Sequence, residues 1–194
     1  MIQSSKYHHS EEQLEEEQKM IALAQKDTSA FEWLYNKYYE QIFRFVYQRL
    51  DDKDVAFDIT SQVFLNAMSA LGNYQYKGVP FASWLYKIAL NELHKAFRKD
   101  ASLRTINIES DRLAELFETH EEDILGEYLP ALKKAMALLP LQESELIELR
   151  FFQQLSFKEI AEITDTTEAN AKMRLYRVLE KLKKQLMSLT HQIA

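Results

Sequence analysis

Cysteine is absent from this sequence of 194 residues, and glycine and proline occur only three times each. Without cysteine there is no disulfide, thiolate metal site or cysteine nucleophile. The scarcity of glycine and proline argues against a turn-rich β architecture and a glycine-rich phosphate loop, and no cofactor is expected. No apolar run approaches the roughly 18 residues of a membrane span, and the polar, acidic start is unlike a signal peptide. We therefore expect a soluble, cytoplasmic protein.

Charge is unevenly distributed along the chain. The formal net charge is −6, and acidic residues are concentrated near the N-terminus and in the middle of the sequence. The last predicted helix is basic instead, through Lys172, Arg174, Arg177, Lys181, Lys183 and Lys184. Because locally concentrated positive charge attracts nucleic acid even when the whole chain is acidic, the distribution matters more than the sum.

Apolar spacing predicts an all-α fold of two small helical domains joined by a flexible linker, the C-terminal one a helix-turn-helix. Residues 20–100 form the first predicted domain and residues 124–194 the second. Residues 1–19 are expected to be a solvated acidic leader. Residues 101–123 are acidic and weakly periodic, which is typical of a linker, with one short helical turn predicted near 113–117.

Three helices are predicted in the first domain. Asp27-Thr28-Ser29 is a helix-start signal before the first of them. The second starts near Asp54, and its apolar spacing predicts a buried face of Val55, Ile59, Val63, Ala67 and Leu71. A loop over 72–80 follows, with two tyrosines expected to be exposed, and Pro80 suits the start of a third helix over 81–99.

The C-terminal part carries the pattern of two capped helices. Ser156 and Glu159 match a capping box at the start of a short helix, and Thr167 can cap the helix that follows. Two helices joined by a turn of about four residues have helix-turn-helix spacing. On a helical wheel, the last helix has an apolar seam formed by Ala171, Leu175, Val178, Leu179, Leu182 and Leu186.

The opposite arc of that last helix predicts a DNA-recognition face, formed by Lys172, Met173, Tyr176 and Arg177. Arginine can read guanine edges, lysine can bind a base or a phosphate, and methionine or tyrosine can pack on a thymine methyl or a sugar. From this helix alone, an ordinary amphipathic helix with a solvated basic face remains an open alternative.

A second stripe lies on the predicted helix over 81–99 and consists of Trp84, Lys87, Asn91, His94 and Arg98. The loop before it adds Tyr74, Tyr76 and Lys77. Aromatic rings beside cations suit an unpaired strand, and Asn91 could meet the polar edge of an extruded base. Taken alone, the aromatic residues could equally belong to the core or its rim. Glu92 falls among the apolar positions Phe81, Leu85, Ile88, Ala89 and Ala96, and the sequence does not explain it.

Three segments of the sequence have a distinctive pattern in their order and spacing: "DVAFDITSQVFLNAMSAL", "PFASWLYKIALNELHKAFRK" and "LLPLQESELIELRFFQQLSFKEIAEITDTTEANAKMRLYRVLEKLKK". Together they resemble the extracytoplasmic-function (group four) sigma factors of the sigma-seventy family. The likeness covers about 20–100 and 125–185. It implies a subunit that binds core RNA polymerase, opens the −10 element and reads the −35 element of promoters.

The resemblance also implies roles for particular residues. The β′ clamp helices of the polymerase would be bound by Asp54, Asp58, Ser61, Gln62 and Phe64. The second domain would approach the β flap. The loop and stripe described above would open the −10 element, and the recognition face would read the −35 element. The residues that would contact DNA phosphates are Ser156, Lys158, Thr167 and Asn170. An anti-sigma factor is a further expected partner.

Two other classes of function remain open from the sequence. An autonomous helix-turn-helix repressor or activator would dimerise on a palindrome, but it would have no use for a surface that suits unpaired bases. A helical adaptor would use the basic faces to contact acidic proteins. An enzyme is not expected because no nucleophile and base pair up, and no metal site is expected because His8 and His9 lie in a polar stretch.

Overall fold

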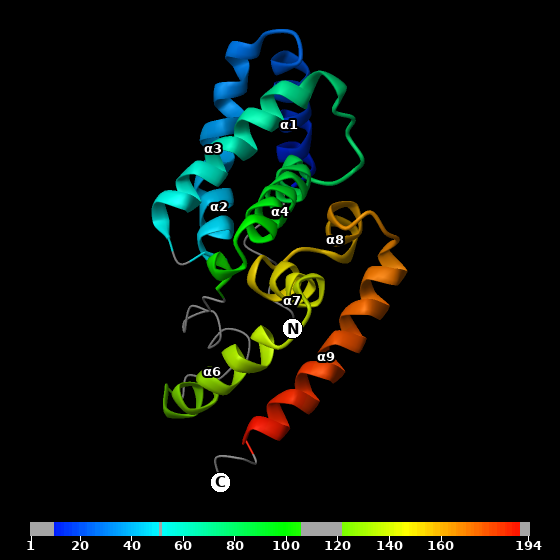
Figure 1. Cartoon of the computed structure of the whole chain (residues 1–194). Coiled ribbons are helices and arrows are strands. Elements are labelled where there is room, and N and C mark those ends of the chain that lie inside the picture. Colours follow the sequence, from blue (N-terminus) through cyan, green and yellow to red (C-terminus); the bar gives the residue numbers. More distant parts are fainter. Residues whose placement is uncertain (1–9, 51, 106–121, 191–194) are drawn as a thin grey trace. The chain divides into compact units, whose positions relative to one another are not determined.

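The computed structural model describes residues 10–50, 52–105 and 122–190, and the predicted all-α class is confirmed (Figure 1). Within these ranges no strand forms, and the only bridge joins Leu50 and Arg104. The chain comprises two units, one made of Met1–Arg104 with the short segment Glu162–Asp165 and the other of Thr105–Ala161 and Thr166–Ala194. None of the helices in the described ranges has both the length and the apolar character needed to cross a membrane.

In its described residues the first unit contains four helices in addition to short 3-10 turns at Thr28–Ala30, Leu71–Asn73 and Ala101–Leu103. The helices are α1 (Glu11–Ala24), α2 (Phe31–Tyr47), α3 (Lys53–Ala70) and α4 (Phe81–Lys99). Helix α1 packs on α2, and α3 packs on both α2 and α4. In Figure 1 the chain between α3 and α4 swings out and returns beside α1. The predicted bounds of α4 are confirmed.

The start of the first domain differs from the expected boundary at residue 20. Helix α1 begins at Glu11, where the Ser10 side chain and the Gln13 side chain form a capping box. Ile21 and Ala24 are buried, and so is the acidic residue Glu17. The described half of the leader is therefore helical, and Glu17 is buried in the domain, whereas Glu11, Glu12, Glu15 and Glu16 are exposed.

The core of the first unit is rich in aromatic residues. Tyr38, Phe45, Phe81 and Tyr86 are the largest side chains buried there to 1% exposure or less. The buried face of α3 is formed by Ala56, Thr60, Val63, Phe64 and Ala67. Val55 and Ile59, which were predicted to be buried, are only half-buried. The helix is rotated relative to the prediction because Phe64 turns inward onto the ring of Phe31, 6.5 Å away between centroids.

The second unit contains α6 (Glu122–Ala137), α7 (Leu141–Ile147), α8 (Phe157–Ile163) and α9 (Glu168–Thr190). Helix α7 continues as a π-helical turn over Glu148–Phe152. Pro140 is the N-cap residue of α7. Helix α9 packs on α6 and α7. The helical turn predicted near 113–117 lies outside the described residues, as does most of the predicted linker.

Candidate nucleic-acid interface

The start of α8 has the predicted capping box. The backbone N–H of Glu159 donates to Ser156 Oγ over 3.2 Å, and the backbone N–H of Ser156 donates to Glu159 Oε2 over 2.8 Å. The segment before it is also held, because Arg150 donates to the carbonyl of Leu155 over 2.7 Å and its guanidinium lies over the ring of Phe157. These local contacts fix where the short helix begins.

The turn between α8 and α9 closes through its own backbone and side chains. Asp165 adopts a left-handed conformation with φ 51°, which aspartate tolerates better than most residues. The N–H of Thr166 donates to the carbonyl of Ala161 over 2.9 Å. Thr167 Oγ1 accepts from the N–H of Asn170 over 3.2 Å, so Thr167 caps α9 as predicted. A capped helix, a tight turn and a second capped helix form the helix-turn-helix.

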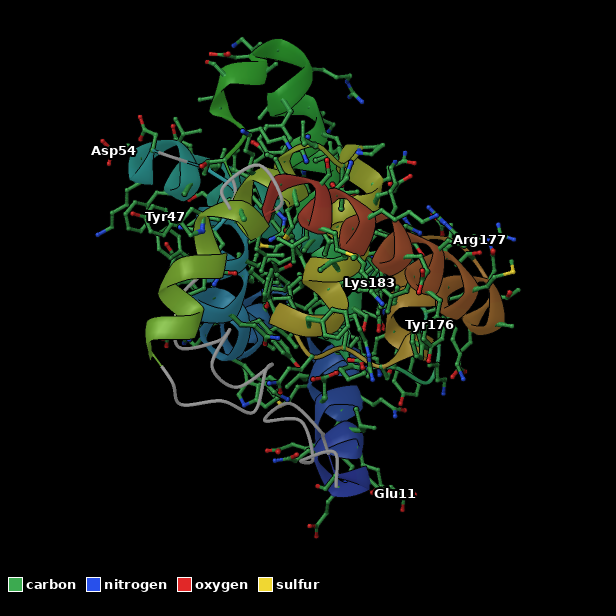
Figure 2. All side chains as sticks on the ribbon, turned by 90° about the horizontal axis from the view of Figure 1, so that it is seen from below. Glu11, Tyr47, Asp54, Tyr176, Arg177 and Lys183 are labelled. Atoms are coloured by element: carbon green, nitrogen blue, oxygen red, sulfur yellow. The ribbon has the colours of Figure 1, made fainter. Side chains whose placement is uncertain are left out.

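Helix α9 has the two predicted faces. Ala171, Leu175 and Val178 are buried to 5% exposure or less. On the other side, Lys172 and Arg177 are exposed, with Met173 at 47% and Tyr176 at 56% exposure. Figure 2 shows Arg177 pointing outward from the α9 ribbon. The predicted recognition residues therefore share one exposed face at the N-terminal half of the helix, and the other predicted residues nearby, Ser156, Lys158, Thr167 and Asn170, flank it at the two caps.

The first unit presents a cluster of three aromatic rings at the start of α4. Tyr74 lies 5.2 Å from Phe81 and 4.9 Å from Trp84, and Phe81 lies 5.3 Å from Trp84, between ring centroids. The expectation that Tyr74 is exposed is wrong, because its ring packs into this cluster. Burial, followed by the negative charge of Glu17, raises the pKa of Tyr74 above its ordinary value. Tyr76 is 38% exposed, as predicted.

The remaining stripe residues follow Trp84 along α4. Asn91 and Arg98 are exposed, and His94 is half-buried. Lys87 lies one turn after Trp84, and Lys77 lies in the preceding loop. Of the predicted buried face, Ile88 and Ala96 are only half-buried. The structure thus groups Tyr76, Lys77 and Trp84 around the N-terminal end of α4 and leaves Arg98 at its far end.

Glu92 on α4, unexplained by the sequence, belongs to a polar network with α3. Its Oε1 accepts from Asn66 Nδ2 over 2.8 Å and from Lys95 Nζ over 2.7 Å. Asn66 in turn accepts from Gln62 Nε2 over 2.8 Å. Because each half-buried polar group has a partner, Glu92 joins the two helices without an unsatisfied charge.

An exposed face of α3 carries most of the residues assigned by resemblance to polymerase binding. Asp54, Asp58, Ser61 and Gln62 are exposed, and Figure 2 shows Asp54 at the outer end of this helix. Phe64 is only 3% exposed and lies 4.9 Å from Tyr35 between ring centroids. The prediction that Phe64 contacts the polymerase is wrong, because its ring lies in the core of the first unit. Leu65 and Met68, which the sequence analysis did not single out, are 53% and 37% exposed on the same helix.

Known families match both units. Residues 34–102 match the family described as Sigma-70 region 2, and residues 129–182 match Sigma-70, region 4. The chain is 30% identical over 148 residues to the RNA polymerase sigma factor SigV of Bacillus subtilis, covering 76% of this chain and 85% of that protein. The chain belongs to the extracytoplasmic-function group of sigma-70 factors. It therefore directs RNA polymerase to promoters, and it acts as a transcription initiation factor.

One further relative and one solved structure are similar to this sigma factor. It is 32% identical over 158 residues to the ECF RNA polymerase sigma factor BldN of Streptomyces coelicolor, covering 80% of this chain but only 60% of BldN. The fold is similar to that of CnrH, solved in complex with the cytosolic domain of CnrY, with a TM-score of 0.61. That likeness has 20% sequence identity and covers 89% of this chain and 97% of CnrH.

The region 2 match begins after the first helix of this sigma factor, at residue 34. Glu17 in α1 is 1% exposed, and its Oε1 accepts from the backbone N–H of Phe81 over 2.6 Å. Its Oε2 accepts from Lys37 Nζ over 3.0 Å and from the hydroxyl of Tyr38. Sequence reasoning missed this residue, although the spacing of Ser10 and Gln13 is a capping-box signal that could have revealed the helix.

Proposed function

We propose that the two units of this sigma factor divide promoter recognition between them, the first opening the −10 element and the second reading the −35 element. The observation that carries this assignment is the exposed face of Lys172, Met173, Tyr176 and Arg177 on the second helix of a capped helix-turn-helix. The N-terminal half of such a helix is the part that enters the major groove. The exposed surface of the first unit has a different chemistry, suited to unpaired bases.

For the −35 element, Arg177 donates to a guanine edge and Lys172 to a base or phosphate, while Met173 and Tyr176 supply apolar contact. The flanking residues position the helix on phosphates. The hydroxyls of Ser156 and Thr167 accept hydrogen bonds as caps, so their hydrogens remain available to donate to a phosphate oxygen. Lys158 and Asn170 lie beside them, at the start of α8 and in the first turn of α9.

For the −10 element, the aromatic cluster supplies a stacking surface and the cations around it supply phosphate contacts. Trp84 is half-buried with two rings packed on it, so it is rigid and can receive a base without a large loss of side-chain entropy. Tyr76 and Lys77 lie in the preceding loop, and Lys87, Asn91, His94 and Arg98 continue along α4.

For binding to core polymerase, the exposed face of α3 offers carboxylates and amides beside apolar side chains. Asp54, Asp58, Ser61 and Gln62 supply the polar part, with Leu65 and Met68 as the apolar part. A mixed surface of this kind is typical of protein interfaces. The β′ clamp helices are the proposed partner of this face, and the β flap is the proposed partner of the second unit.

An anti-sigma factor is the further partner that we propose. The supporting observation is that CnrH, whose fold is similar, was solved with the cytosolic domain of CnrY. The acidic segment between the two units is proposed to lie within the polymerase, where its charge would resemble that of nucleic acid in a basic channel. That segment falls largely outside the described residues.

Run-off transcription tests the proposal. Core RNA polymerase is mixed with this chain on a fragmented genomic library, and the transcript starts are sequenced. We expect starts that share spaced −10 and −35 sequences and that are absent without the chain. The double variant Tyr176→Ala, Arg177→Ala should lose most of them. Unchanged transcription by this variant would favour the adaptor, and tight binding of the chain alone to a palindromic duplex would favour the autonomous repressor.

A further inference from the structure

Helix α1 contacts both ends of the loop over 72–80. At the start of the loop, Gln25 Nε2 donates to the carbonyl of Leu71 over 3.0 Å and to the carbonyl of Tyr74 over 2.9 Å. At its end, Glu17 Oε1 accepts from the backbone N–H of Phe81. Gln25 is the C-cap residue of α1, and Glu17 lies about two turns earlier on the same helix.

Glu17 acts as a helix cap supplied from another helix. Phe81 is the first residue of α4, and the residue before it, Pro80, makes no side-chain capping hydrogen bond. The first N–H groups of a helix have no partner within the helix, and its N-terminus favours a negative charge. A carboxylate from α1 meets both requirements. The same carboxylate is bound by Lys37 and Tyr38 of α2, so three helices meet at this one buried side chain.

The position of Phe81 determines the position of the stacking surface. Its ring contacts both Tyr74 and Trp84. Tyr74 is itself held by its carbonyl through Gln25. Between the two fixed ends, only Gly78 has a positive φ, 73°, and the side chains of Tyr76 and Lys77 are exposed. The loop ends are thus held by α1, while Tyr76 and Lys77 between them are exposed and Val79 is buried.

We propose that Glu17 and Gln25 are positioning residues that shape the loop over 72–80 for an unpaired −10 base. This inference rests on the proposed function of the first unit. Helix α1, which precedes the region matched to Sigma-70 region 2, then acts as a brace for base recognition, although none of its residues touches DNA. Loss of either hydrogen-bonding group should relax the choice of base more than it weakens polymerase binding.

The experiment uses the full chain with core polymerase on a premelted template whose non-template strand is randomised across the −10 positions. Transcripts are sequenced to obtain the base preference at each position. Gln25→Ala is the informative variant because Gln25 is exposed and its loss leaves the core intact. Lys26→Ala, next to it and also exposed, is the matched control. Glu17→Gln, compared with Glu16→Gln, tests the other end of the loop.

We expect Gln25→Ala to reduce the strongest base preference about fivefold or more, because both hydrogen bonds from its Nε2 to the loop are lost, with unchanged affinity for core polymerase. Glu17→Gln should reduce it as well, measured below the melting temperature of the variant, and both controls should behave as the unchanged chain does. Full base preference in both Gln25→Ala and Glu17→Gln would overturn the inference. If the unchanged chain itself showed no −10 preference, the proposed function would fail instead.

Discussion

The two units of this sigma factor are stabilised in different ways. The core of the first contains large aromatic side chains together with a buried carboxylate that joins α1, α2 and α4. The described core of the second is mainly aliphatic, with Met136, Leu139, Leu146 and Leu149 among its most buried side chains. The polar contacts that shape its helix-turn-helix join residues only a few positions apart.

This difference follows from what each surface has to recognise. A recognition helix needs only one exposed face and a defined start, and local capping provides both. A surface that receives an unpaired base needs rings and a loop held in a fixed arrangement, and here both ends of that loop are held by a helix distant in the sequence, α1. In the first unit this arrangement is held by a hydrogen bond between residues far apart in the sequence, Glu17 and Phe81.

Trp84→Ala should have the largest effect on promoter opening, because it removes a ring from the stacking surface. Base stacking on an aromatic side chain contributes about 1–3 kcal/mol, so strand opening should fall about tenfold or more. Binding to core polymerase should be unaffected. Permanganate footprinting of thymines in the −10 region measures opening. Normal thymine reactivity with the variant would show that the aromatic cluster serves only the core.

Glu17→Ala should destabilise the first unit by about 3 kcal/mol, because it leaves the N–H of Phe81 and the hydroxyl of Tyr38 without an acceptor. Both tryptophans of the chain, Trp33 and Trp84, lie in the first unit, so tryptophan fluorescence during denaturation reports on that unit alone. Glu16→Ala, at an exposed position of the same helix, should cost less than about 0.5 kcal/mol. Equal stabilities of the two variants would show that the buried carboxylate of Glu17 does not stabilise the first unit, and the contrast with the second unit would be lost.

Arg177→Ala should cost about 1–3 kcal/mol of discrimination between promoters, the typical contribution of a good base contact. Competition between two −35 sequences in run-off transcription measures this loss. Lys183 is also exposed and lies further along α9. Lys183→Ala should therefore affect transcription from the two −35 sequences equally. If both variants reduced transcription from all promoters to the same degree, the exposed face of α9 would bind only phosphates.

Ser156→Ala should destabilise the second unit by about 1 kcal/mol, the usual effect of losing a helix N-cap. Circular dichroism follows the helices of both units, and tryptophan fluorescence should remain unchanged. Ser188→Ala, an exposed serine near the end of α9, is the control. A shift in the fluorescence transition would mean that the caps of the second unit also stabilise the first.

Alkaline pH should weaken the first unit selectively. Burial, followed by the charge of Glu17, raises the pKa of Tyr38 above its ordinary value of 10.0. A raised pKa means that the folded state favours the neutral phenol over the phenolate. The stability that Tyr38 contributes is therefore complete below pH 10 and declines as the pH rises further. We expect a loss of up to about 1 kcal/mol at pH 10.5 by tryptophan fluorescence. Tyr38→Phe should reduce this dependence, and an unchanged slope would contradict the assignment.

Much of the second unit could be predicted from the sequence. The capping box of Ser156 and Glu159, the cap at Thr167 and the exposed face of Arg177 all follow from spacing along one chain segment, since each contact spans four residues or fewer. In the first unit, the bounds of α4 were predicted in the same way. The inward rotation of Phe64 was not, because an aromatic ring on a helix can face the core or a partner until the neighbouring helices are in place.

What the residues determine by themselves is local: two sets of amphipathic helices, their caps and the chemistry of each exposed face. Only the tertiary structure decided that α1 packs on α2, that Tyr74 packs on Trp84, and that Glu17 caps α4. A periodic pattern reports which side of a helix is apolar, but it carries no information about which distant backbone group a buried carboxylate will meet. That pairing depends on how the helices pack, and here it shapes the proposed site for an unpaired base.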